Sequence, residues 1–172
     1  MIIDILKYLF RFFLILLFQL LIVNNIELNT YINPYIYIIF ILTLPVSMKP
    51  WLVVVISFFT GMVMDTFSST PGLHMAATVF MGYLRGFYLR FATSKEDMES
   101  RIEPNLSGKG LVWFLVYLIF MTLLHHMVLF YLEIFGFKEF FRTMARVFVS
   151  AFFSIGIITI GQLLFYKSGK RV

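Results

Sequence analysis

The sequence contains no cysteine and few charged residues. Without cysteine, the chain has no disulfide, no thiol nucleophile and no cysteine-ligated metal. Only 13% of its 172 residues are charged, against about 25% in an ordinary soluble domain, whereas 60% are hydrophobic. A globule of this composition could not cover its surface with polar groups, so we expect the chain to be embedded in lipid. Its length fits one compact bundle without a second soluble domain.

The patterns that mark enzymes and nucleotide-binding proteins are also missing. No combination of serine, histidine and acid is typical of a catalytic triad, no two carboxylates share a span, and no ligand cluster suits a metal. No glycine-rich phosphate loop is present. The net charge of +5 could indicate nucleic acid, but the charges lie at the ends of apolar segments, where they orient a membrane protein. We therefore expect a non-enzymatic protein without a cofactor, a metal or a nucleic-acid partner.

Long apolar segments recur along the chain, and a spanning helix needs about 20 mostly apolar residues. Pro45 and Pro50 bracket Lys49 inside the apolar region 35–64, which favours a tight turn over one long helix. Pro34 suits the first position of the helix before that turn. The first apolar run lacks a signal-peptide cleavage site, so we expect it to be retained. The predicted fold is an all-α integral membrane bundle of about six transmembrane helices in a single domain, 1–172, with spans at about 3–23, 32–48, 50–66, 72–90, 110–131 and 143–166.

Positive charge orients these predicted spans. With six spans and a cytoplasmic N-terminus, eleven of the 14 lysines and arginines lie in the cytoplasm, and only Lys138, Arg142 and Arg146 lie outside. Fusing residues 35–64 into one span would move eight of them outside. Because lysine and arginine are in excess on the cytoplasmic side of membrane proteins, we predict that both termini are cytoplasmic. The main cytoplasmic loop, 91–109, is then either a docking surface for a partner or a solvated linker.

Several polar residues fall inside the predicted spans or near their ends. His125 and His126 lie in the middle of the fifth span, and side chains at adjacent helical positions point about 100° apart. We therefore expect them to make interhelical hydrogen bonds rather than to form a proton relay or a metal site. Arg146 is either a cation that reaches to the membrane surface or an ion-pair partner of Asp65 or Glu133.

Small residues at helical spacing predict close helix packing. Gly82 and Gly86 share one face of the fourth span, and Ser150, Ser154 and Gly161 share one stripe of the sixth. In lipid, such residues let two backbones approach closely. The pattern does not tell whether the neighbouring helix belongs to this chain or to a second copy, so a homo-oligomer remains open.

The junction of the third and fourth spans reads GMVMDTFSSTPGLH over residues 61–74 and carries one carboxylate in a long uncharged region. Asp65 is expected to end the third helix on the outer side of the membrane. Thr70 is then a suitable N-cap of the next helix, with Pro71 at its first position and Gly72 after it. On this interpretation the stretch is a turn between two spans.

The spacing in this junction also resembles that of a known family. Gly61, Asp65 four positions later and Gly72 seven positions further, followed by two alanines that open an apolar span, resemble MreD, the rod shape-determining membrane protein family. That family has this Gly-x3-Asp-x6-Gly pattern at the junction of two central spans. The specific part of the resemblance covers residues 57–90, about a fifth of the chain, and the remainder resembles the family in hydropathy and size.

The resemblance implies a scaffold in bacterial cell elongation. MreD proteins are non-enzymatic, multi-pass subunits of the Rod complex, or elongasome, in the inner (cytoplasmic) membrane, and they take part in the regulation of cell shape and side-wall peptidoglycan synthesis. They associate with MreC, which links cytoplasmic MreB filaments to the glycosyltransferase and transpeptidase of the side wall. On this basis Gly61, Asp65 and Gly72 are expected to fix the crossing of spans three and four and so to shape a surface for the partner.

The family fold is similar to that of the substrate-binding subunits of energy-coupling-factor vitamin transporters, which are also six-helix bundles. Such a subunit is the alternative function. It would need a polar pocket in the outer half of the bundle, and the candidates for lining one are few and lie at its rim: Asn24, Asn25, Asn33, Thr70 and His74.

Overall fold

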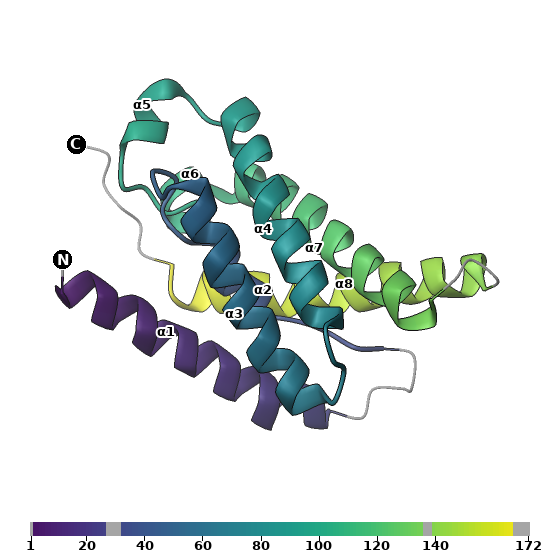
Figure 1. Ribbon diagram of the computed structural model, residues 1–172. Coiled ribbons are helices and arrows are strands. Elements are labelled where there is room, and N and C mark those ends of the chain that lie inside the picture. Colours follow the sequence, from purple (N-terminus) through teal and green to yellow (C-terminus); the bar gives the residue numbers. More distant parts are fainter. Residues whose placement is uncertain (1, 27–31, 136–138, 167–172) are drawn as a thin grey trace.

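The computed structural model describes residues 2–26, 32–135 and 139–166, and this part of the chain is helical without a strand (Figure 1). Four helices are long and apolar enough to cross a membrane, which agrees with the predicted all-α membrane class. They are α1, extended by the short helix η1, and α3, α7 and α8. The elements are α1 (Ile2–Leu21), η1 (Val23–Asn25), α2 (Ile38–Leu42), α3 (Pro50–Ser68), α4 (Leu73–Ala92), α5 (Lys95–Glu99), α6 (Leu106–Lys109), α7 (Leu111–Ile134) and α8 (Phe140–Leu164).

The helices α3, α4, α7 and α8 pack side by side in this order, and α3 with α4 is the most extensive pair. The turn 69–72 joins α3 to α4 at one end of the bundle, which we call the corner end. The connection 93–110, with α5 and α6, lies at the opposite end, which we call the loop end. Five of the predicted spans lie close to α1, α3, α4, α7 and α8. Helix α4 is as long as α1 but less apolar, because it contains glycine, alanine, threonine and histidine as well as Arg85 and Arg90.

The predicted helical span at 32–48 is wrong. Residues 32–36 have no regular secondary structure, the helix α2 covers only Ile38–Leu42, and turns follow up to the start of α3. Pro34 therefore does not begin a helix. The segment runs beside α1 in the opposite direction, because Ile36 contacts Gln19 near one end of α1 and Thr43 contacts Arg11 nearer the other.

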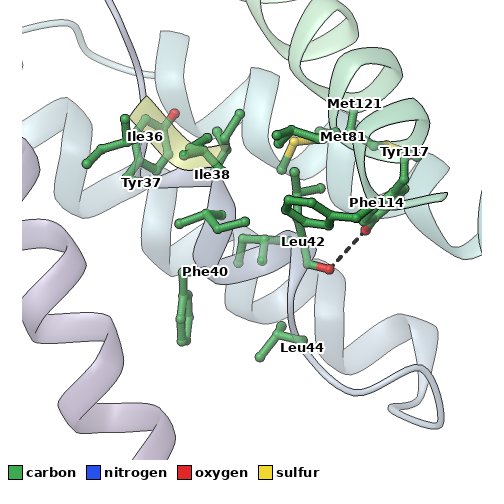
Figure 2. Packing of buried hydrophobic residues seen from close by; sticks show 14 of the residues in the cluster. Ile36, Tyr37, Ile38, Phe40, Leu42, Leu44, Met81, Phe114, Tyr117 and Met121 are labelled. Atoms are coloured by element: carbon green, nitrogen blue, oxygen red, sulfur yellow. Dashed lines mark hydrogen bonds between the residues drawn. The ribbon is translucent and has the colours of Figure 1, made fainter. Parts of the chain in front are cut away.

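This segment, residues 32–48, forms the centre of the bundle, and we call it the central segment. Every residue from Ile36 to Val46 is buried, and the segment contacts α1, α3, α4 and α7. Figure 2 shows its side chains gathered with Met81 of α4 and with Phe114 and Met121 of α7. Irregular backbone at membrane depth is tolerated only where protein covers it, because lipid offers no hydrogen bonds. The burial of this segment meets that condition.

Side chains of the surrounding helices satisfy the irregular backbone. Gln19 of α1 accepts hydrogen bonds from the Ile36 and Tyr37 amides at 2.7 and 3.2 Å and donates to the Pro34 carbonyl at 3.1 Å. Further along, the Tyr117 hydroxyl donates to the Leu42 carbonyl at 3.0 Å (Figure 2). Each of these groups would otherwise be an unpaired polar atom in an apolar interior.

Replacing Gln19 with leucine should therefore destabilise the fold although it makes α1 more apolar. The substitution leaves two buried amides and one carbonyl without a partner, and we expect the free energy of unfolding to fall by about 1–3 kcal/mol. Unfolding by sodium dodecyl sulfate from mild detergent micelles measures it. Leu17→Ala, on the exposed side of α1, is the control for a change on the same helix. A Gln19→Leu protein as stable as the parent would contradict the assigned role.

Charged pairs hold the connection 93–110 against α1. The Glu103 carboxylate accepts hydrogen bonds from Lys7 Nζ at 3.1 Å and from Arg11 Nη1 at 2.9 Å. Burial alone would raise the pKa of Glu103, but the charges of Arg11 and Lys7 outweigh it, and its pKa lies below the usual value. The Ile102 carbonyl of this connection accepts a further hydrogen bond from the Val46 amide at 2.9 Å. The middle of this connection is therefore anchored to the bundle.

Candidate functional site

The carboxylate of Asp65 lies at the junction of α3 and α4 and accepts four hydrogen bonds from its own chain. Oδ1 accepts from Thr70 Oγ1 at 3.1 Å and from the His74 amide at 2.9 Å. Oδ2 accepts from the Gly72 amide at 3.1 Å and from the Met75 amide at 2.9 Å. Three of these donors are backbone amides at the start of α4, which no carbonyl of that helix can satisfy. Asp65 thus caps α4 from the preceding helix, and its negative charge lies at the positive end of the α4 dipole.

The close approach of α3 and α4 at this junction depends on Gly61. A Cβ atom on Gly61 would lie 2.7 Å from the Met75 nitrogen and 2.8 Å from the His74 carbonyl oxygen. These are backbone atoms, which cannot turn aside as a flexible side chain can. Gly61 therefore brings the start of α4 within reach of Asp65, one helical turn along α3. We call Gly61, Asp65 and the turn 69–72 the corner.

Within the corner, the predicted capping of α4 is wrong. The N-cap residue is Gly72 and not Thr70, so α4 begins at Leu73 and Pro71 lies before the helix. Gly72 has φ 86°, in the left-handed region that side chains other than glycine rarely adopt. The hydroxyl of Thr70 donates to Asp65 instead of accepting from the helix.

A second group of polar residues lies in the interior around Tyr37. Its hydroxyl lies 2.7 Å from His125 Nε2, 3.1 Å from His74 Nδ1 and 3.0 Å from Thr78 Oγ1. All four side chains are buried. Within the part of the chain that the structure describes, His125 Nδ1 has no hydrogen-bond partner. The group connects the central segment with α4 and α7 and so holds three elements together.

His126 points to a different neighbour from that of His125. Its Nε2 lies 3.1 Å from Ser154 Oγ of α8, and its Nδ1 lies 2.9 Å from the Thr122 carbonyl. In the described part of the chain, no three or more histidine, aspartate or glutamate side chains are placed to hold a metal. Both histidines join α7 to other segments through hydrogen bonds.

The small residues predicted on α8 have different environments. Ser150 and Ser154 accept hydrogen bonds from the Asn33 and Tyr35 amides, at 3.1 and 2.9 Å. They therefore satisfy the irregular backbone of the central segment as well as providing room for it. Gly161 has open space around its Cα, with no atom within 4 Å of an added Cβ.

Gly82 and Gly86 lie on the face of α4 that meets the beginning of α3. A Cβ on Gly82 would lie 3.0 Å from the Ser57 Cβ and would meet its hydroxyl. A Cβ on Gly86 would be 3.6 Å from Pro50, which is ordinary contact distance. The α3–α4 pair is thus close along its length, with Gly61 near the corner end and Gly82 nearer the loop end.

Of the two interpretations of Arg146, the ion pair is the one observed. Its Nη1 lies 3.0 Å from Glu133 Oε2, and its guanidinium carbon lies 4.1 Å from the centre of the Phe130 ring. The pair borders a cavity of about 300 Å³ at the corner end. Four of the five predicted rim candidates line this cavity beside the ion pair, and Asn25 does not: Asn24, Asn33, Thr70 and His74.

The sequence alone assigns no role to Gln19 and Tyr37, and it assigns Arg85 only the role of a cytoplasmic charge. A single glutamine in an otherwise apolar span is a signal for Gln19, because polar groups at membrane depth usually face protein. The same argument applies to Arg85, which lies between the two glycines of GYLRG and is only 2% exposed. Tyr37 has no such signal, since tyrosine is common in apolar runs.

The chain matches no protein-family model, no curated protein and no solved structure in the comparisons made with each of these sets. The polar side chains of the corner and of the group around Tyr37 form hydrogen bonds with the chain's own backbone and side chains. Such an arrangement can hold helices in a fixed relation to one another and so present a defined surface.

Proposed function

We propose that this protein is a non-enzymatic scaffold subunit of the bacterial cell-elongation complex, embedded in the inner membrane and associated with an MreC-like partner. The observation that carries the proposal is the corner. Gly61, Asp65 and Gly72, the residues of the MreD-like pattern, act together there: one allows the close approach, one binds the start of α4, and one provides the left-handed turn. Residues that fix the shape of the helix bundle are suited to a protein that assembles with partners.

In this proposal the chain crosses the membrane six times, and the central segment is one of the crossings, made without a continuous helix. Its contacts with Gln19 and with Arg11 lie eight residues apart on α1, which is about 12 Å along a helix. The corner end faces outward and the loop end faces the cytoplasm, as the excess of lysine and arginine favours.

An alkaline phosphatase reporter tests this orientation. Fused after Glu99 in α5, it should be inactive, since the enzyme matures only outside the cytoplasm. Fused after Ser69 in the turn of the corner, it should be active. Strong activity at Glu99 would reverse the proposed topology.

The corner also borders a surface for the partner. A hollow of about 510 Å³ lies at the corner. It is open toward the region that lipid or a neighbouring helix would occupy. Its lining combines apolar and hydroxyl side chains with the turn itself: Met62, Asp65, Thr66, Ser69, Pro71, Gly72 and Met75.

Crosslinking and co-purification test the proposed partner. Because the chain has no cysteine, single-cysteine variants are free of background. We expect Thr66→Cys to crosslink to a co-expressed MreC-like protein, and Phe152→Cys, on the exposed side of α8, to serve as the control with little product. We expect Asp65→Asn, which distorts the corner, to insert into the membrane and to recover less partner in a pull-down. If Asp65→Asn recovered as much partner as the parent and both cysteines crosslinked equally, the corner would not be part of the partner surface.

One observation favours the second candidate, a substrate-binding subunit of an energy-coupling-factor-type transporter. The corner-end cavity of about 300 Å³ has polar lining and, in the proposed orientation, opens on the outer side. Neighbouring genes separate the two candidates: an MreC-like coding region immediately upstream supports the scaffold, whereas two ATPases and a coupling subunit support transport. A purified protein that retains a vitamin in this cavity would favour the transporter.

A further inference from the structure

A buried arginine lines a cavity at the loop end that neither proposed function uses. Arg85 of α4 is only 2% exposed. One of its nitrogens, Nη2, donates to the Leu44 carbonyl, and its buried Nε has no hydrogen-bond partner among the described residues. No carboxylate of the described chain forms an ion pair with it. A cation removed from water without a counter-ion is costly, so a neutralising group is expected nearby.

The cavity beside Arg85 has the size and charge to hold such a group. Its volume is about 240 Å³, and it lies between the beginning of α3 and the second half of α4. Lys49 and Arg90 line it together with Arg85, and no acidic residue of the described chain does so. Asp97 on the nearby α5 is engaged elsewhere, at 2.6 Å from Lys109.

The beginning of α3 adds to the positive potential of this cavity. The N-cap residue Lys49 and the first residue Pro50 both line it, so the positive end of a 19-residue helix dipole is directed there. Helix beginnings favour anions for this reason, and arginine favours phosphate, because its planar group can make two parallel hydrogen bonds. Gly82 and Gly86 bring α4 close to α3 at this point and leave the cavity unfilled by side chains.

We propose that this cavity binds a phosphate group, with Arg85 as its principal ligand and Lys49 and Arg90 at its rim. The apolar part of the lining, Val53, Leu89 and Met98, suits a phospholipid whose head group enters and whose chains lie along α3 and α4. In the orientation proposed above, the site lies in the cytoplasmic leaflet, where anionic lipids bind basic pockets between membrane helices. The inference does not depend on a role in cell elongation.

Lipid titration by native mass spectrometry tests this site with the full chain in mild detergent. We expect phosphatidylglycerol to bind more tightly than phosphatidylcholine, and Arg85→Gln to weaken phosphatidylglycerol binding by about 30-fold or more. Lys49→Gln should weaken it by about fivefold. Arg142→Gln, the same change at the opposite end of the bundle, should leave it unaltered.

Two further experiments cover a misfolded Arg85 variant and distinguish lipid from soluble phosphate. If Arg85→Gln does not fold, as judged by helicity and gel filtration, the Lys49→Gln and Arg90→Gln variants decide in its place. Inorganic phosphate added to protein in phosphatidylcholine nanodiscs separates the sources: an Arg85-dependent rise in melting temperature assigns the site to soluble phosphate, and its absence assigns it to lipid when phosphatidylglycerol binds. Binding of neither ligand, or binding that is unchanged in the cavity variants, would overturn the proposal. A failed pull-down of the MreC-like partner would leave this result unaffected.

Discussion

We expect Asp65→Ala to lower the free energy of unfolding by about 4 kcal/mol or more, and Asp65→Asn by about 2–4 kcal/mol. Alanine leaves the Thr70 hydroxyl and three backbone amides without an acceptor. Asparagine keeps one oxygen, and its amide group then faces donors. The Thr70 hydroxyl can rotate to accept from that group, but the second donor on the same side, a backbone amide, cannot.

Unfolding by sodium dodecyl sulfate from mild detergent micelles, followed by circular dichroism, measures the two Asp65 variants. Thr66→Ala is the control, since Thr66 is the next residue of α3, is exposed, and bonds only to the carbonyl one turn before it. We expect Thr66→Ala to stay within about 0.5 kcal/mol of the parent. Asp65 does not end α3 as the sequence predicts, because the helix continues to Ser68. An Asp65→Asn protein as stable as the parent would show that the charged carboxylate does not stabilise the corner.

The second large effect is expected from adding a single carbon at Gly61. Gly61→Ala places its Cβ against backbone atoms of His74 and Met75, so α3 and α4 must separate where Asp65 holds them together. Overpacking alone costs typically 1–3 kcal/mol, and the weakened Asp65 contacts add to it. We therefore expect a loss of about 3 kcal/mol or more in the free energy of unfolding.

The matched control for Gly61→Ala is the same substitution in α8. Gly156 is exposed, and an added Cβ would meet no atom within 4 Å. Because alanine favours the helix over glycine, Gly156→Ala should stabilise the protein by up to about 1 kcal/mol. The same detergent titration gives both values. Effects of the same sign and size at the two glycines would contradict the close approach of α3 and α4.

The corner could be located from the sequence, because its signals are local. A glycine, a carboxylate four residues later and a Pro-Gly pair interrupt an apolar run, and such punctuation marks a turn wherever it occurs. The partners of Asp65 could not be found this way. Capping by Gly72 rather than Thr70 depends on a close approach between two helices, which a linear pattern does not encode.

The sequence predicts a helix for the central segment because burial on all sides removes periodicity. A short, fully apolar run does not distinguish a spanning helix from a buried irregular segment. Two signals favoured the irregular form: prolines at both ends, and tyrosine and isoleucine, which suit extended backbone. The decisive signals lie elsewhere in the chain, in Gln19, Ser150 and Ser154, because their side chains accept hydrogen bonds from the backbone of the central segment.

Arg85 shows the reverse situation. As one of several arginines near the end of a predicted span, it has the ordinary role of marking the cytoplasmic side. Within the stretch GYLRG, Gly82 and Arg85 are buried, whereas Tyr83 is exposed, so the face of α4 that carries Arg85 is directed inward. The rotation of a helix is set by its packing over the whole α3–α4 pair, which a local sequence pattern does not encode; at Gly61 and Gly82 an added Cβ would meet the neighbouring helix.

Depletion of the protein in its native host addresses its role in cell elongation. We expect rod-shaped cells to become round as the protein is lost, while vitamin uptake stays intact. Re-expression of the parent chain should restore the rods, and the Gly61→Ala chain should fail to do so although the Gly156→Ala chain succeeds. Cells that keep a normal rod shape after complete depletion would contradict the proposed function.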